Sequence, residues 1–189
     1  VVLKKAAGLD IQMLLPLHGF VWRQDLGYIL GKYDLWSRYE PEQRGVVIAY
    51  ASVYGGTENA ANILACRLRE QGVQVEMFDT SVTPASYILA AAFRFSHVVL
   101  AAPTYNGGVF VTMENLLHDL TAHGLKGRRA AYIENGSWAP TSARGMQKLL
   151  EPLNWETAAD TVTLRSALRQ GQQEDLERMA MQLAESVKA

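Results

Sequence analysis

The sequence predicts an α/β fold built on a parallel sheet, because two hydrophobic patterns alternate from Gly45 to the end of the chain. Short β-branched or apolar runs recur every 24 to 32 residues, which is the length of one strand plus a crossover helix. Segments with apolar residues three and four positions apart lie between these runs. We therefore expect helices that pack against a sheet of parallel strands.

The apolar runs indicate four strands, and a fifth, weaker strand is expected within residues 158–164. The four strands are residues 46–51, 73–78, 97–102 and 129–133. Each expected helix carries one apolar stripe that should face the sheet. The stripes of three helices are Ala61, Leu64, Ala65 and Leu68; Met113, Leu116, Leu117 and Leu120; and Leu176, Met179, Ala180, Leu183 and Val187. Thr83 is expected to cap a further helix that has Pro84 at its first position.

The length fits one domain with an appendage, since a typical domain has roughly 150 residues and this chain has 189. The hydrophobic fraction of 49% fits a folded, globular protein. Eighteen basic and nineteen acidic side chains leave a net charge of −1 with no basic run, which argues against a nucleic-acid partner. No apolar stretch approaches the roughly 20 residues that cross a membrane. The single cysteine, Cys66, cannot form an internal disulfide. We expect a cytoplasmic protein with no membrane partner.

Residues 1–44 lack the strand–helix rhythm, and we expect them to form an N-terminal appendage to a domain of residues 45–189. The appendage is rich in aromatic side chains, namely Phe20, Trp22, Tyr28, Tyr33, Trp36 and Tyr39. Within it, residues 33–39 are expected to form a short helix, and residues 40–44 a polar connector to the first strand.

A loop rich in glycine and hydroxyl groups joins the first strand to the first helix and is the strongest local signal of a binding site. It consists of Ser52, Val53, Tyr54, Gly55, Gly56 and Thr57. Such a loop exposes consecutive main-chain N–H groups at the positive end of a helix, where they can hold a phosphate. It lacks the lysine of a triphosphate-binding loop and the glycine spacing of a dinucleotide fold, so a terminal monophosphate is the better match. A tight turn in which Thr57 only caps the helix remains open as the alternative.

Two further loops follow the third and fourth strands, and parallel strands bring them to the same edge of the sheet. The first contains Pro103, Thr104, Tyr105, Asn106, Gly107 and Gly108, and the second contains Asn135, Gly136, Ser137 and Trp138. They supply flat rings, amide groups and accessible main-chain N–H groups. Together with the phosphate loop they predict a site for a planar heterocycle that bears a phosphate tail, unless the aromatics are ordinary surface residues.

These three loops resemble the flavin mononucleotide (FMN) loops of flavodoxins, and more closely those of flavodiiron proteins, also called A-type flavoproteins. Residues 15–23 and 33–39 look like the end of that family's metallo-β-lactamase-like domain and its joint to the flavodoxin domain. The resemblance implies a flavodoxin-like three-layer sandwich with a five-stranded parallel sheet in the order 2-1-3-4-5. It also implies that residues 1–44 are the remnant of the metallo-β-lactamase-like domain, and that all sixteen loop residues named above contact FMN.

Flavodiiron proteins pass electrons from the flavin to a di-iron centre that reduces dioxygen or nitric oxide. His18 matches the family's last iron-ligand histidine, and the resemblance implies that the other ligands lie in a region that this chain lacks. We therefore expect no metal in this chain, and the di-iron centre only in a full-length parent. Two departures from the family's phosphate loop, Gly56 in place of the common Asn and Val53 in place of the frequent Met, remove no hydroxyl or main-chain donor.

The leading hypothesis is an electron carrier in which FMN supplies the redox chemistry and no side chain acts as a catalytic acid or base. By the same resemblance, rubredoxin or a reductase is the expected donor, and a homo-oligomer is expected because family members form head-to-tail dimers. One alternative is a flavodoxin-like NAD(P)H-dependent FMN reductase or quinone reductase. The non-enzyme alternative is a phosphate-binding or receiver-type module, which would need acidic residues where Ala51 and Ser52 stand.

Overall fold

The computed structural model describes residues 2–6 and 8–189, and it divides into two compact units, Val1–Glu40 and Pro41–Ala189. The second unit begins four residues before the predicted boundary, because the first strand of its sheet already begins at Gln43. That the first unit is the remnant of another domain stays a prediction. Among the described helices, none is long and apolar enough to cross a membrane.

The first unit contains helix α1 (Val2–Ala6), helix α2 (Leu26–Ser37) and one antiparallel bridge between Leu14 and Trp22. The short helix expected at residues 33–39 is therefore longer and begins about two turns earlier, at Leu26. Two glycines, Gly27 and Gly31, weaken the helix signal of its first half, which explains the missed start.

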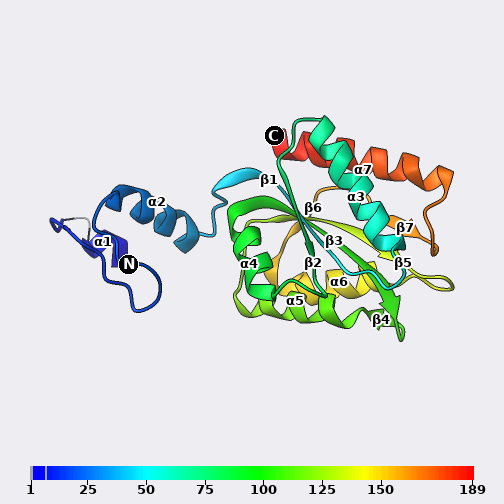
Figure 1. The fold of residues 1–189 in the computed structure, drawn as a ribbon, viewed down its shortest axis with the longest axis horizontal. Coiled ribbons are helices and arrows are strands. Elements are labelled where there is room, and N and C mark those ends of the chain that lie inside the picture. Colours follow the sequence, from blue (N-terminus) through cyan, green and yellow to red (C-terminus); the bar gives the residue numbers. More distant parts are fainter. Residues whose placement is uncertain (1, 7) are drawn as a thin grey trace. The chain divides into compact units, whose positions relative to one another are not determined.

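The second unit is built on a parallel sheet, so the α/β class and the parallel arrangement are confirmed (Figure 1). Its strands are β1 (Gln43–Tyr50), β2 (Val75–Asp79), β3 (Phe95–Tyr105), β5 (Arg129–Asn135), β6 (Glu156–Thr157) and β7 (Val162–Leu164), with a short β4 (Gly108–Val109). The order is β2-β1-β3-β5-β6, with β7 also beside β5 and β4 antiparallel to β3. The central strands β1 and β3 are covered on both faces, which is why their sequences are almost continuously apolar.

The strand expected within residues 158–164 is β7, and the unpredicted two-residue strand β6 comes just before that range. Because the short β4 was also not predicted, the expected order 2-1-3-4-5 corresponds to β2-β1-β3-β5 followed by β6 and β7, which share the last position. The chain leaves the sheet between the two segments because Gln182 of the last helix holds Asp160. The Gln182 side chain accepts from the Asp160 N–H at 2.9 Å and donates to its carboxylate at 2.9 Å. Both segments still pair with β5 in the parallel sense.

Helices cover both faces of the sheet (Figure 1). Helices α3 (Gly56–Glu70) and α7 (Gln170–Lys188) pack together on one face, and α4 (Ala85–Arg94), α5 (Val111–Ala122) and α6 (Ser142–Leu150) cover the other, followed by a 3₁₀ turn (Glu151–Leu153). The predicted stripes of α3, α5 and α7 are buried throughout. One detail was wrong: Pro84, and not Thr83, is the N-cap of α4, because Thr83 belongs to a turn in which its N–H donates to Asp79.

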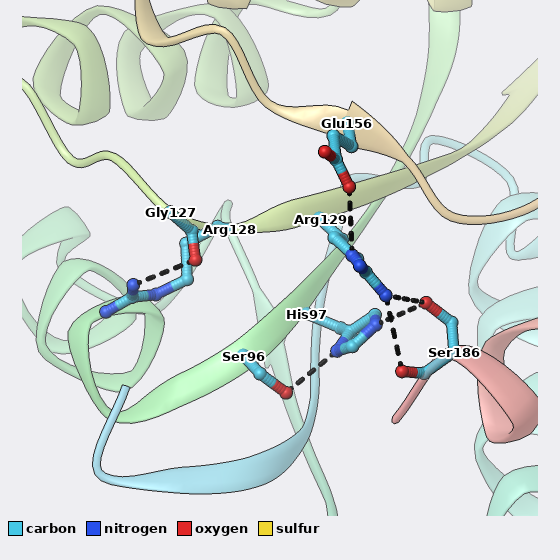
Figure 2. A network of polar contacts seen from close by, with 7 residues as sticks. All are labelled: Ser96, His97, Gly127, Arg128, Arg129, Glu156 and Ser186. Carbon is cyan, nitrogen blue, oxygen red and sulfur yellow. Dashed lines mark hydrogen bonds and ion pairs between the residues drawn. The ribbon is translucent and has the colours of Figure 1, made fainter. Parts of the chain in front are cut away.

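A polar network lies at the amino-terminal edge of the sheet around His97, which is buried with 3% of its surface exposed (Figure 2). The ring contacts Ser96 Oγ through Nδ1 at 2.8 Å and Ser186 Oγ through Nε2 at 2.9 Å. Arg129 donates to Ser186 Oγ at 3.0 Å. Ser96 Oγ donates its proton to the Gly45 carbonyl at 3.3 Å, so it accepts from Nδ1, and the Ser186 hydroxyl donates to Nε2. The proton of the neutral imidazole is thus assigned to Nδ1, which donates to Ser96. Burial, with the charges of Arg129 and Arg44, lowers the pKa of His97 from 6.5 to about 4.

This network predicts a specific loss of stability in acid. The unfolded chain protonates His97 near pH 6.5 and the folded chain only near pH 4, so the contribution is complete above pH 6.5 and is lost as the pH falls to 4. We expect about 3 kcal/mol of unfolding free energy to disappear over that range. Urea unfolding of the wild type and of His97→Gln between pH 4 and 7.5 measures it. Parallel pH profiles for the two proteins would contradict the assignment.

Candidate functional site

The carboxyl ends of β1, β3, β5 and β7 meet at one edge of the sheet, as parallel strands require. The three loops predicted from the sequence follow β1, β3 and β5, and the structure brings them together there. A fourth segment, residues 165–169, follows β7 at the same edge. This edge is the candidate site.

The loop after β1 is open toward a ligand. Gly55, with φ +80°, is the N-cap of α3, and no side chain caps this helix. In the part of the chain that the structure describes, the N–H groups of residues 52–58 donate to no protein acceptor. The Ser52 hydroxyl is buried and also lacks a partner there. A buried hydroxyl without a partner costs free energy, so this arrangement is suited to an anion that accepts from the hydroxyl and the N–H groups together.

Thr57 does not play the capping role that the alternative reading gave it. It lies one residue inside α3, its side chain is 2% exposed, and its hydroxyl receives a hydrogen bond from Asn135 Nδ2 at 3.3 Å. By contrast, Tyr54 is 98% exposed, and Val53 is also exposed. The loop therefore presents donors on its inner side and an aromatic ring to solvent.

The loop after β3 is shorter than expected, because β3 continues through Pro103 and Thr104 to Tyr105 and Gly108 already belongs to β4. The two strands form a hairpin whose turn is Asn106-Gly107, with φ of 49° and 75°. Positive φ at both positions is the conformation that Asn-Gly favours in two-residue hairpins. Tyr105 is half exposed and packs edge-on against Phe110, with ring centroids 5.7 Å apart.

The loop after β5 is fixed at its ends and exposed at its tip. At one end the Gly136 N–H donates to the Leu164 carbonyl at 3.2 Å. At the other, Thr104 Oγ1 accepts from the N–H groups of Thr141 at 2.8 Å and Ser142 at 3.1 Å, which ties this loop to β3. Trp138, between the two ends, is 92% exposed. Two fixed loops thus present Tyr105 and Trp138 at one edge.

The fourth segment was missed in the sequence analysis. The Ser166 main chain, in the left-handed region at φ 65°, exchanges two hydrogen bonds with Asn135, and Ser166 Oγ lies 3.0 Å from Ser137 Oγ. A Cβ on Gly56 would lie 2.5 Å from the Ser166 carbonyl oxygen, so glycine is required there. The end of the weak fifth strand was the signal that could have located the segment.

Two carboxylates lie near the end of β1, where Tyr50 is partly buried. Burial raises the pKa of Tyr50, and the charges of Glu58 and Asp79 raise it further. The phenol therefore stays protonated at neutral pH. Glu58 lies in the first turn of α3, where its negative charge interacts favourably with the positive end of the helix dipole.

His18 lies in the first unit, in an exposed loop beside an apolar cavity of about 590 Å³ whose lining includes Trp22, Tyr33 and Trp36. Within residues 2–6 and 8–189, no three His, Cys, Asp or Glu side chains gather in a way that could hold a metal ion. The match of His18 to a family iron ligand therefore stays an expectation for a longer parent protein.

The fold and its edge loops can be compared with known proteins. No protein-family model matches the chain. Rubredoxin-oxygen oxidoreductase of Megalodesulfovibrio gigas is 23% identical over 185 residues, which is 97% of this chain and 46% of that protein. The nitric oxide reductase of Moorella thermoacetica is 29% identical over 143 residues, which is 76% of this chain and 35% of that protein. The flavodiiron protein of Giardia intestinalis matches 99% of this chain with a TM-score of 0.88 at 21% identity, over 47% of its own length.

The homologues of the chain are flavodiiron proteins. The resemblance drawn from the loops is thereby confirmed, and the chain spans less than half the length of these relatives. A flavodoxin of Streptococcus pneumoniae TIGR4 matches 75% of this chain and 98% of its own length, with a TM-score of 0.65 at 24% identity, which confirms the flavodoxin-like fold. Fold and homology together point to FMN as the cofactor and to an oxidoreductase-type module.

The contact between Gly56 and Ser166 can be tested by adding one methyl group. Gly56→Ala would force the Ser166 segment away from α3, and we expect a loss of about 1–3 kcal/mol in unfolding free energy. Gly171→Ala is the matched control, because a Cβ there meets nothing within 4 Å, and it should be neutral or stabilising by up to about 1 kcal/mol. Equal stability of the two variants in urea would show that the close approach does not exist.

Proposed function

We propose that the unit Pro41–Ala189 binds FMN and serves as the electron-carrying domain of a flavodiiron-type oxidoreductase. The observation that carries this proposal is the buried, unpartnered Ser52 hydroxyl beside the free N–H groups of residues 52–58. Homology to flavodiiron proteins supports the choice of FMN among the phosphorylated ligands that such donors could hold.

The phosphate end of the site needs no cation. Main-chain N–H groups at the start of α3 carry the positive end of the helix dipole, and Ser52 and Thr57 add hydroxyl donors. A monophosphate requires several donors in one place, which this loop offers without a lysine. A triphosphate carries more negative charge, and the same residues would neutralise it less well.

The ring end of the site is formed by the loops that carry Tyr105 and Trp138. FMN, when bound, supplies one- and two-electron transfer. The chain's own part is to stack the ring against exposed aromatic side chains and to offer main-chain N–H groups from the Asn106-Gly107 turn. No side chain at this edge needs to act as a general acid or base.

Homology supports a proposal for the parent protein and its partners. Relatives are named rubredoxin-oxygen oxidoreductase and nitric oxide reductase, so a full-length parent would reduce dioxygen or nitric oxide at a di-iron centre to which His18 contributes. Rubredoxin or a reductase would be the electron donor, and the location would be cytoplasmic.

Exposed apolar side chains of the first unit, among them Leu15, Leu17 and Phe20, favour association into a homo-oligomer. Sedimentation as a monomer at micromolar concentration would contradict that part of the proposal.

Removing the hydroxyl of Thr57 tests the phosphate end. We expect Thr57→Val to weaken FMN binding by about 1–2 kcal/mol, because one hydrogen bond to the phosphate is lost. Quenching of flavin fluorescence in a titration of the purified, flavin-free chain measures the dissociation constant. Thr161→Val, at an exposed threonine between β6 and β7, is the control and should leave the constant unchanged. An unchanged constant in Thr57→Val would show that the hydroxyl is not a ligand.

The carrier role itself is tested by reduction of the FMN-loaded chain. A carrier should accept electrons from a reduced donor protein and should not be reduced rapidly by NADH or NADPH alone. Absorbance at the flavin band follows both reactions. Rapid bleaching by a nicotinamide cofactor without a partner would contradict the carrier role and favour a reductase.

A further inference from the structure

Asn135 joins three segments of the candidate site that are far apart in the sequence. Its side chain is 7% exposed, at the end of β5. Nδ2 donates to Thr57 Oγ1 at 3.3 Å and to the Ser166 carbonyl at 2.9 Å, and Oδ1 accepts from the Ser166 N–H at 2.9 Å. One amide thus connects the first turn of α3 with the segment after β7.

These bonds leave Asn135 little capacity to bind a ligand directly. A side-chain amide has two N–H donors, and both are engaged by Thr57 and Ser166. The family resemblance implied that Asn135 contacts FMN, and this stays a prediction. Its donors, however, face the protein.

The bond to Thr57 determines what the threonine hydroxyl can do. A hydroxyl that accepts a hydrogen bond from an amide N–H keeps its own proton for another acceptor. Among the described residues, no protein atom accepts the Thr57 proton. Since Thr57 is almost fully buried and lies beside the free N–H groups of the loop, this proton is available to the phosphate.

We propose that Asn135 is a positioning residue that sets the donor direction of Thr57 and thereby makes the site selective for phosphorylated flavin over riboflavin. This rests on the proposed FMN function and concerns only its phosphate end. The loops that carry Tyr105 and Trp138 are held by other bonds, chiefly those of Thr104 to the main chain of Thr141 and Ser142. Loss of the Asn135 amide should therefore leave ring binding in place.

Two substitutions at Asn135 separate the donor role from simple filling of space. Asn135→Ala removes the bridge. Asn135→Asp keeps the shape but replaces the N–H donors by a carboxylate, which repels the Ser166 carbonyl and accepts the Thr57 proton. The aspartate variant should therefore harm phosphate binding more than the alanine variant does, although it retains the acceptor for the Ser166 N–H.

The experiment titrates wild type and variants with FMN and, separately, with riboflavin, following flavin fluorescence. We expect the FMN dissociation constant to rise about tenfold in Asn135→Ala and more in Asn135→Asp, while that for riboflavin changes less than about twofold. In a protein that already carries Thr57→Val, adding Asn135→Ala should raise the FMN dissociation constant by less than about twofold, because the two residues act through one hydroxyl. Gln182→Leu is the matched control: its amide makes a similar two-bond bridge to Asp160, and it should leave both constants unchanged.

The outcomes separate this proposal from the proposed function. Equal losses for FMN and riboflavin, or no loss for either, would overturn the positioning role while wild-type FMN binding stands. A larger loss in alanine than in aspartate would also overturn it. Failure of the wild-type chain to bind either flavin would overturn both proposals. Melting temperatures of the flavin-free variants show whether each is folded. If Asn135→Ala does not fold, the isosteric Asn135→Asp variant still tests the proposal, because its loss of FMN binding can be compared with its loss of riboflavin binding.

Discussion

The site depends on a set of main-chain N–H groups that the fold itself cannot satisfy. A helix leaves its first N–H groups without intrahelical acceptors, and here neither a side-chain cap nor the preceding turn supplies one. The buried Ser52 hydroxyl adds a further unsatisfied group at the same place. A stable protein tolerates such an arrangement where a ligand completes it. The parallel sheet determines where this happens, because it aligns the ends of β1, β3, β5 and β7 along one edge.

Around these open donors, several other polar groups of the edge are paired with one another. Asn135 bridges to Thr57 and Ser166, Thr104 accepts from the main chain of the Trp138 loop, and Glu134 accepts from the Ala143 N–H at 3.1 Å at the start of α6. These bonds hold the loops before any ligand arrives, which lowers the entropy lost on binding. At the amino-terminal edge, by contrast, the buried His97 ring is bonded to Ser186, and the Ser186 hydroxyl also accepts from the partly exposed Arg129. The open donors described above therefore lie at the carboxyl edge of the sheet.

Much of this arrangement could be predicted from the sequence. Hydrophobic periodicity is visible within a short stretch of residues, and the alternation of strands and helices indicates a parallel sheet. The buried stripes of α3, α5 and α7 follow from spacing alone. The hairpin at Asn106-Gly107 was treated as a loop, although Asn-Gly favours such a turn. The separation of β6 from β7 depends on Gln182, and the Gly56–Ser166 approach joins residues 110 positions apart. Such tertiary contacts leave no local pattern, so the role of Asn135 could only be found in the structure.

The central claim is that main-chain amides at the start of α3 hold the phosphate of FMN. The most direct measurement is the ¹H–¹⁵N spectrum of the isotope-labelled, flavin-free chain during addition of FMN and of riboflavin. The account predicts large downfield shifts of the Gly55, Gly56 and Thr57 amide protons with FMN and much smaller ones with riboflavin. If FMN binds while these three amide signals stay in place, the phosphate is held elsewhere and the account is wrong.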